Sequence, residues 1–227
     1  MAALSTMFSG LSLTAREPTR PFRLLDLPPE LRRLIYEAIL APEPFIQLDL
    51  CDSWGHFLNF LVANRQIYRE AEPILYRRNI FCTPLNRPAA LDTYLQMLGP
   101  IASKIIHLRI PMPVMTSINF PPQRLNRRGV ENLRSIQRMC TSIERLDMDI
   151  TPRDRPFFDP ERTSPVLIEP ILSDYLSRLD EELKRIRSLK RVTIVYTEPF
   201  DLSPTVKDAM REFGWFIKRL KPTPTPF

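Results

Sequence analysis

The chain has 227 residues, of which 44% are hydrophobic, so it can build one medium domain or a small helical module joined to a larger one. Its 32 Lys and Arg residues against 26 Asp and Glu residues give a formal net charge of +6. This basic excess is spread along the chain, and it suits association with an acidic partner rather than nucleic-acid binding. The three cysteines form no CxxC pair, which excludes a disulfide framework and a structural zinc site of the usual spacing.

Targeting signals are sparse in this sequence. No apolar stretch approaches the ~20 residues that a membrane-spanning helix needs, so no membrane association is expected. Residues 1–20 lack the basic and apolar segments of a secretory signal, and we expect them to form a disordered leader. The cysteine pattern favours a reducing compartment, and hence a cytoplasmic or nuclear location.

The first ordered part is predicted to be helical. Apolar residues at helical spacing predict one helix that ends at Leu40, before Pro42, and another from about Phe57 to Glu72. A short extended segment is expected between them, at residues 45–50. Residues 21–82 are therefore predicted to form an N-terminal helical module. The arginine pairs Arg32–Arg33, Arg77–Arg78 and Arg127–Arg128 are isolated in sequence, and we interpret them as ordinary solvated surface.

Residues 83–220 show three units of a helix followed by a short strand. Helices are expected at 88–98, 130–139 and 169–186, strands at 105–110, 143–150 and 189–196, and a closing helix at 204–220. The strands share the L-x-x-L-x-L pattern of leucine-rich repeats, and their alternation with helices predicts a parallel sheet. The expected fold class is therefore mixed, helix-rich α/β, with degenerate leucine-rich-repeat-like units, a small parallel sheet of about three strands, and a flexible tail at 221–227.

One face of this sheet is a candidate binding surface. Because side chains alternate along a strand, Asp147 and Asp149 share a face, and they could contact a protein partner together with residues of the neighbouring strands. The full candidate set is Arg109, Asp147, Asp149, Arg191 and Thr193. The alternative is that these residues form the solvent-facing side of a one-sided sheet. His56 and His107 lie near no recognisable nucleophile motif, so no catalytic residue, metal or cofactor is expected, and the chain is predicted not to be an enzyme.

The N-terminal segment also resembles a known family. Leu27-Pro28-Pro29-Glu30-Leu31, followed by Ile35 and Leu40, is similar to an F-box opening of the form L-P-x-E-[IL]-x3-I-x4-L. Segments 22–40 and 64–81 together resemble a large group of F-box-like proteins of filamentous fungi, whose second segment reads C-R-Q-I-Y-x-E-A-x-P-I-L-Y-x2-N-x-F. Asn64 stands where the family usually has Cys.

The resemblance implies a helical module that docks on the linker subunit of a cullin–RING ubiquitin ligase, followed by a domain that holds a substrate. The docking ridge would consist of Leu27, Pro28, Leu31, Ile35 and Leu40. The alternative is that these residues bury within the chain, against Leu61, Tyr68 and Leu75. In function, the chain is expected to be a non-enzymatic protein-interaction protein that serves as a substrate adaptor, or else an F-box-like scaffold without a ubiquitin-ligase role.

Overall fold

The computed structural model describes residues 23–41, 45–48, 51–83, 91–113, 127–150, 158, 165–198 and 200–221, with only the backbone path given for 51–54 and 165–171. The predicted leader at 1–20 and all of the predicted tail except Lys221 lie outside the described residues. The chain is an α/β protein with one parallel sheet, as the sequence predicts at this level.

Three helices form the N-terminal part. A 3-10 turn, Leu24–Asp26, leads into α1 (Pro29–Leu40), and α2 (Cys51–Val62) and α3 (Arg65–Arg78) follow. The single helix predicted at 57–72 is therefore wrong: the chain breaks at Asn64. The side-chain oxygen of Asn64 accepts a hydrogen bond from the Gln66 backbone N–H at 2.7 Å, and this cap starts a new helix. Helix α3 then continues past Pro73 to Arg78.

The sheet has six strands, all parallel, in the order β1-β2-β3-β4-β5-β6. The strands are β1 (Phe45–Gln47), β2 (Ile80–Cys82), β3 (His107–Pro111), β4 (Arg145–Asp149), β5 (Arg191–Thr197) and β6 (Phe216–Leu220). The expectation of about three strands is thus wrong. Strands β1 and β2 are three residues each. Strand β1 lies within the extended segment predicted at 45–50, whereas β2 is too short to show a periodic pattern. They also lie before the boundary predicted at 82/83, so one sheet runs through both predicted domains.

The end of the chain also differs from the prediction. Helix α8 (Pro204–Glu212) stops early, and β6 replaces the second half of the helix expected at 204–220. Gly214 adopts a φ of 78°, a left-handed conformation that glycine tolerates and that ends helices. Its N–H donates to the Arg211 carbonyl at 2.8 Å, and the chain then turns into the sheet.

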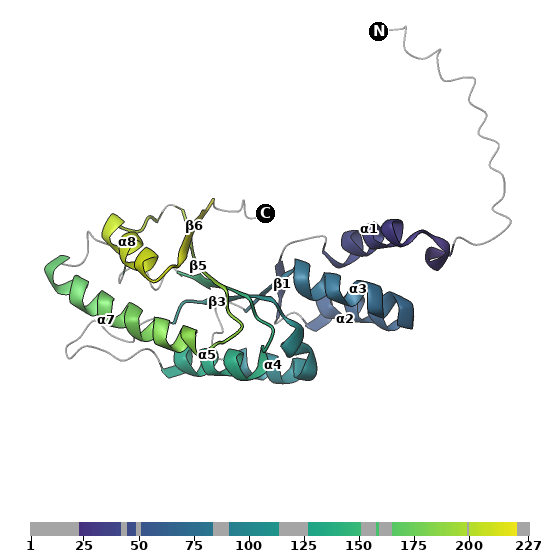
Figure 1. Cartoon of the computed structure of the whole chain (residues 1–227), viewed down its shortest axis with the longest axis horizontal. Helices are drawn as coiled ribbons and strands as arrows, with labels where there is room; N and C mark the ends of the chain where they lie inside the picture. Colours follow the sequence, from purple (N-terminus) through teal and green to yellow (C-terminus); the bar gives the residue numbers. More distant parts are fainter. Residues whose placement is uncertain are drawn as a thin grey trace, which may run out of the picture.

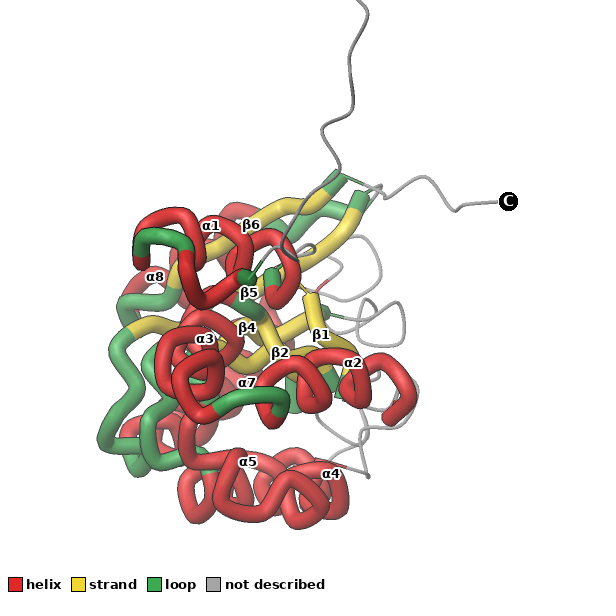
Figure 2. Tube along the Cα trace, turned by 90° about the vertical axis from the view of Figure 1, so that its right-hand side faces the viewer, coloured by secondary structure: helices red, strands yellow, loops and turns green. Residues whose placement is uncertain are grey.

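The remaining helices cover the sheet. They are α4 (Leu91–Leu98), followed by a 3-10 segment (Gly99–Lys104), α5 (Arg127–Met139) and α7 (Pro165–Lys184). Figure 1 shows α4, α5 and α7 side by side beneath the strands, and α8 packs on α7. Figure 2, viewed from the end that carries α1, α2 and α3, shows the twisted strands one behind another with α4 and α5 below them.

The core lies between the strands and these helices. Residues of the L-x-x-L-x-L pattern are buried and lie side by side, because Leu108 pairs with Leu146 and Leu146 with Val192. The predicted alignment of these three strands is therefore the observed register. The six-strand parallel sheet is established, whereas the leucine-rich-repeat and F-box character of the units is not decided by it.

Candidate functional site

The predicted sheet-face residues do share one face of the sheet. In-register partners on parallel strands point the same way, and Arg109 pairs with Asp147, which pairs with Thr193. Arg109 donates two hydrogen bonds to Asp149, from Nε at 2.8 Å and from Nη2 at 2.6 Å. Nε2 of His107 lies 3.1 Å from an Asp147 carboxylate oxygen, but it is not aligned for a hydrogen bond. The face therefore carries a ladder of paired charges.

Burial sets the electrostatics of this ladder. Burial raises the pKa of Asp149 above its usual value, although the hydrogen bonds from Arg109 act in the opposite direction. Burial would also raise the pKa of Asp147, but the interactions with His107 and Thr193 outweigh it and leave that pKa lowered. On the same face, burial raises the pKa of the Cys82 thiol to about 12, so this sulfur is not an activated thiolate nucleophile.

Exposure separates the five predicted contact residues. Asp147, Asp149 and Thr193 are 9%, 8% and 6% exposed, whereas Arg191 is exposed and lies over the Phe216 ring at 4.0 Å. Arg109 is intermediate, and its guanidinium lies 5.2 Å from the centre of the Phe45 ring. The alternative of a solvent-facing strand side is thus wrong for the two aspartates. Partner contact at these five residues stays a prediction, with Arg191 the most accessible of them.

The predicted ridge on α1 is only partly exposed. Pro28 and Leu31 are exposed, and Leu27 and Ile35 are intermediate. Leu40 is 0% exposed and lies in the core, so a partner cannot reach its side chain. The reason is that α1 turns Arg32, Tyr36 and Leu40, one residue per turn, towards the rest of the chain.

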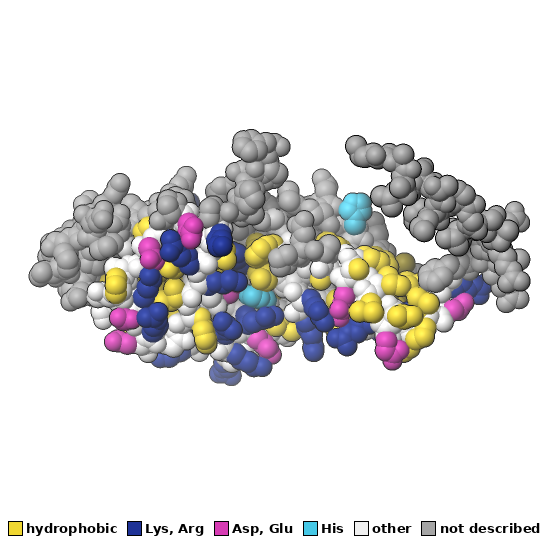
Figure 3. Space-filling model, turned by 90° about the horizontal axis from the view of Figure 1, so that it is seen from above, with side chains coloured by type: hydrophobic (Ala, Val, Ile, Leu, Met, Phe, Trp, Pro, Cys, Tyr) yellow, Lys and Arg dark blue, Asp and Glu magenta, His cyan; other side chains and the backbone are white. Residues whose placement is uncertain are grey.

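The exposed apolar surface of α1 is extended by residues that the sequence pattern did not single out. Leu34 is 61% exposed and Ile39 is 40% exposed. Figure 3 shows hydrophobic side chains gathered at this end of the molecule. Of the residues proposed to bury the ridge, Leu61 and Leu75 are in the core, whereas Tyr68 is 41% exposed.

The sequence did not predict a groove of about 430 Å³ between α1 and α3. Arg33 reaches it from α1, and Arg77 and Arg78 reach it from α3. The other lining residues are Pro29, Tyr36, Glu70, Pro73 and Ile74. Arg33 and the pair Arg77–Arg78, which are far apart in sequence, thus meet at one site. All three are exposed, which agrees with their interpretation as solvated surface, but they are not isolated in space.

The base of this groove is a hydrogen-bonded network around Glu70. Arg32 donates to both Glu70 oxygens, at 2.9 and 2.7 Å, and Tyr36 Oη and Gln66 Nε2 add bonds at 3.0 and 2.9 Å. The hydrogen bonds from Arg32, and after them the one from Gln66, lower the pKa of Glu70 to about 2. Glu70 is therefore ionised and neutralised by Arg32, and it joins α1 to α3.

The rim of the groove keeps an excess of positive charge. Arg33 and Arg78 share one oxygen of Glu37, at 3.0 and 2.7 Å. Arg77 forms no ion pair with a described residue. Arg33 and Arg78 thus share one carboxylate, and Glu70 is already paired with Arg32, whereas the charge of Arg77 also acts on Glu144 and helps to lower its pKa.

Metal-ligand clusters and membrane-spanning helices were sought among the residues that the structure describes. No three or more His, Cys, Asp or Glu side chains of those residues form a cluster that could hold a metal ion. No helix among them is both long and apolar enough to cross a membrane. The predicted location stays a prediction.

Comparison with known proteins gives little. No protein-family model and no curated protein matches the chain. One solved structure does, the arginine decarboxylase of Paramecium bursaria Chlorella virus bound to agmatine, with 14% identity and a TM-score of 0.33. The match covers 85% of this chain and 62% of the viral one, so the chain spans less than two thirds of that protein.

This match bears on the predicted function. The matched protein is an enzyme, whereas the sequence predicted a non-enzymatic interaction protein, either an adaptor or a scaffold, and neither role is carried forward. A likeness of this size also assigns no activity here. Decarboxylation and agmatine binding are properties of the viral protein, and the function of this chain has to be argued from its own residues.

Proposed function

We propose that this chain binds an anionic ligand in the groove between α1 and α3. The observation that carries the proposal is the convergence of Arg33, Arg77 and Arg78 on one groove, whose own carboxylate, Glu70, is already paired with Arg32. Guanidinium groups present several N–H donors in a fixed plane, so they bind carboxylate and phosphate groups by paired hydrogen bonds. The ligand class is therefore a molecule that bears a carboxylate or a phosphate.

The lining and the base of the groove narrow this class. Pro29, Pro73 and Ile74 add apolar contacts, which suit a ligand with a hydrophobic part beside its anionic group. The volume of about 430 Å³ lies within the range of roughly 300–1,000 Å³ that is usual for ligand sites. Because the Glu70 network fixes α1 against α3, the arginines are held in place before the ligand arrives, which reduces the entropic cost of binding.

The predicted protein partners fit within this proposal. An acidic side chain or a C-terminal carboxylate of a partner has the required chemistry, and the overall charge of +6 favours its approach. The partly exposed ridge formed by Leu27, Pro28, Leu31 and Ile35 faces away from the groove, and its role in partner binding is a separate proposal.

The finer description of the fold is also proposed. We take residues 21–82 as a module of the F-box-like type that they resemble, and the later helix–strand units as degenerate leucine-rich-repeat-like units. Support for the second point comes from the sequential order of the strands and from the common register of β3, β4 and β5. Neither assignment implies a role in a ubiquitin ligase.

Fluorescence polarisation tests the binding proposal. The probe is a fluorescein-labelled peptide of alternating Leu and Glu residues, with the Leu and Gln peptide as a neutral reference. The double variant Arg77→Gln plus Arg78→Gln should bind the acidic peptide about tenfold more weakly or worse, since contacts to charged groups contribute ~1.5–3 kcal/mol each.

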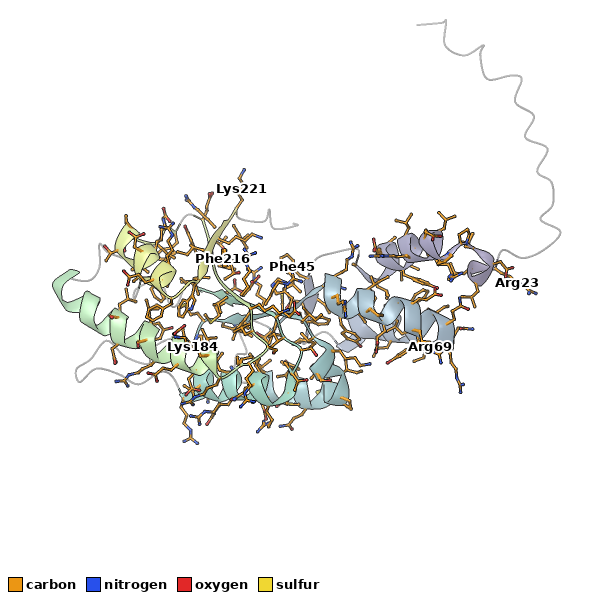
Figure 4. All side chains as sticks on the ribbon, in the orientation of Figure 1. Arg23, Phe45, Arg69, Lys184, Phe216 and Lys221 are labelled. Atoms are coloured by element: carbon orange, nitrogen blue, oxygen red, sulfur yellow. The ribbon has the colours of Figure 1, made fainter. Side chains whose placement is uncertain are left out.

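A matched double variant controls for the loss of charge. Arg65 and Arg69 are exposed on the same helix, line no part of the groove, and Arg69 lies on the side of α3 away from α1 in Figure 4. Arg65→Gln plus Arg69→Gln should leave the affinity within about twofold. Equal affinity of the two double variants would refute the groove as the site, and so would equal binding of the acidic and neutral peptides. Competition with inorganic phosphate shows whether a phosphate can replace the carboxylate.

A further inference from the structure

Strand β6 lies at an edge of the sheet, far from the groove. It pairs with β5 along its whole length, from Thr193 opposite Phe216 to Thr197 opposite Leu220. On its other side, no strand of the described residues pairs with it. An edge strand presents a row of free backbone N–H and C=O groups that another extended chain can pair with.

The side chains of this edge are basic. Lys218 and Arg219 lie within β6 and Lys221 follows it, and all three are exposed. Among the described residues, the one acidic partner of these three is Glu198, whose carboxylate lies 3.4 Å from Arg219. Figure 4 shows Lys221 projecting from the end of the strand, beyond Phe216. Like charges opposite each other destabilise a strand pair, so this edge disfavours a second copy of itself and favours an acidic strand.

Phe216 gives the edge an apolar anchor. Its side chain is 51% exposed, and the guanidinium of Arg191 lies 4.0 Å from the ring centre. A cation over an aromatic face stabilises the pair and limits the motion of the ring. Exposed aromatic and arginine side chains of this kind are enriched among the residues that dominate binding energy at interfaces.

We propose that the edge of β6 binds an extended acidic segment of a protein partner, which adds to the sheet as a further strand. The backbone of the segment pairs with the free groups of β6. Because side chains alternate between the two faces of a strand, its acidic side chains lie on the face of Arg219 and Lys221, and its apolar side chains lie on the opposite face, beside Phe216. This site lies at the opposite edge of the sheet from β1 and is independent of the groove between α1 and α3.

Three labelled eight-residue peptides test this inference by fluorescence polarisation. The first alternates Glu and Val, the second replaces each Glu with Gln, and the third is the Glu and Val peptide with alternate backbone nitrogens methylated. The Glu and Val peptide should bind, and each of the other two should bind at least about tenfold more weakly, because one lacks the charge and the other lacks the backbone donors. Equal binding of the methylated peptide, or no binding of the Glu and Val peptide, overturns strand addition.

Protein variants locate the site. Arg219→Gln plus Lys221→Gln should weaken binding of the Glu and Val peptide about tenfold, whereas Lys184→Gln plus Arg187→Gln, an exposed pair of equal charge near the end of α7, should change it less than about twofold. The peptides and these variants are measured on protein that also carries Arg77→Gln and Arg78→Gln, because an acidic peptide would otherwise bind the groove as well. Binding of the peptide should also slow hydrogen exchange at the amides of residues 216–220. Unchanged affinity in the 219/221 variant overturns the assignment to β6.

Discussion

Replacing Glu70 with glutamine tests the network that joins α1 to α3. The fall in the pKa of Glu70 from 4.5 to about 2 corresponds to about 3 kcal/mol at ~1.36 kcal/mol per unit. Because the side chain of Glu70 is 30% exposed, solvent screens part of this interaction, and we expect Glu70→Gln to lower the free energy of unfolding by about 2 kcal/mol at pH 7. Urea denaturation followed by circular dichroism measures this difference.

The pH dependence gives a second readout of the same variant. The pKa of Glu70 is lower in the folded than in the unfolded chain, so its contribution is fully present above pH 4.5 and is lost as the pH falls towards about 2. The difference in stability between the wild type and Glu70→Gln should therefore shrink as the pH falls from 7 to 3.

A surface ion pair provides the control. Glu131 pairs with Arg127, and these side chains are 54% and 92% exposed, so Glu131→Gln should change stability by less than about 0.5 kcal/mol. If Glu70→Gln were no less stable than Glu131→Gln at pH 7, or if its deficit did not depend on pH, the network would not join the two helices as described.

Two further predictions concern the sheet and its helices. Gly129→Ala should destabilise the protein by about 1–3 kcal/mol, because an added Cβ would lie 2.5 Å from the Cβ of Pro113, whereas Gly55→Ala, with nothing within 4 Å, should stabilise α2 by up to about 1 kcal/mol. Thermal denaturation measures both, and a Gly129→Ala protein that melts at or above the wild-type temperature contradicts the close approach. In the ladder of charges on the sheet, a double-mutant cycle of Arg109→Gln and Asp149→Asn should give a coupling energy of about 1–3 kcal/mol. Each single change leaves the other, largely buried side chain charged but without an opposite charge beside it. A coupling energy near zero in urea unfolding would refute a structural ion pair there.

The helices and strands whose residues follow a periodic pattern along the sequence were predictable. The strands β3, β4 and β5 follow from the alternation of apolar and polar residues, and the shared L-x-x-L-x-L pattern predicts their relative register. Helices α1, α5 and α7 follow from apolar residues at helical spacing. Such patterns persist in the fold because one face of each element must be buried.

Capping chemistry and short strands were not predictable in this way. Asn64 breaks an otherwise helical pattern because its side chain satisfies a backbone N–H two residues later, and Gly214 ends α8 because it accepts a positive φ. Strand β1 lies in the extended segment predicted at 45–50, but β2 is too short for a period to be read. The two join the sheet because β1 pairs with β2 and β2 with β3, which satisfies their backbone groups.

The charged residues show most clearly which features the sequence determined and which the tertiary structure decided. The sequence by itself determined the net basic charge, the two separate arginine pairs and the acidic residues of β4. Only the tertiary structure decided that Arg33 meets Arg77 and Arg78 across a groove, that Asp147 and Asp149 are buried with partners, and that Lys218 and Arg219 lie on an open edge. The reason is that these charges interact over distances set by the packing of α1 on α3 and of strand on strand, and that packing depends on residues far apart along the chain.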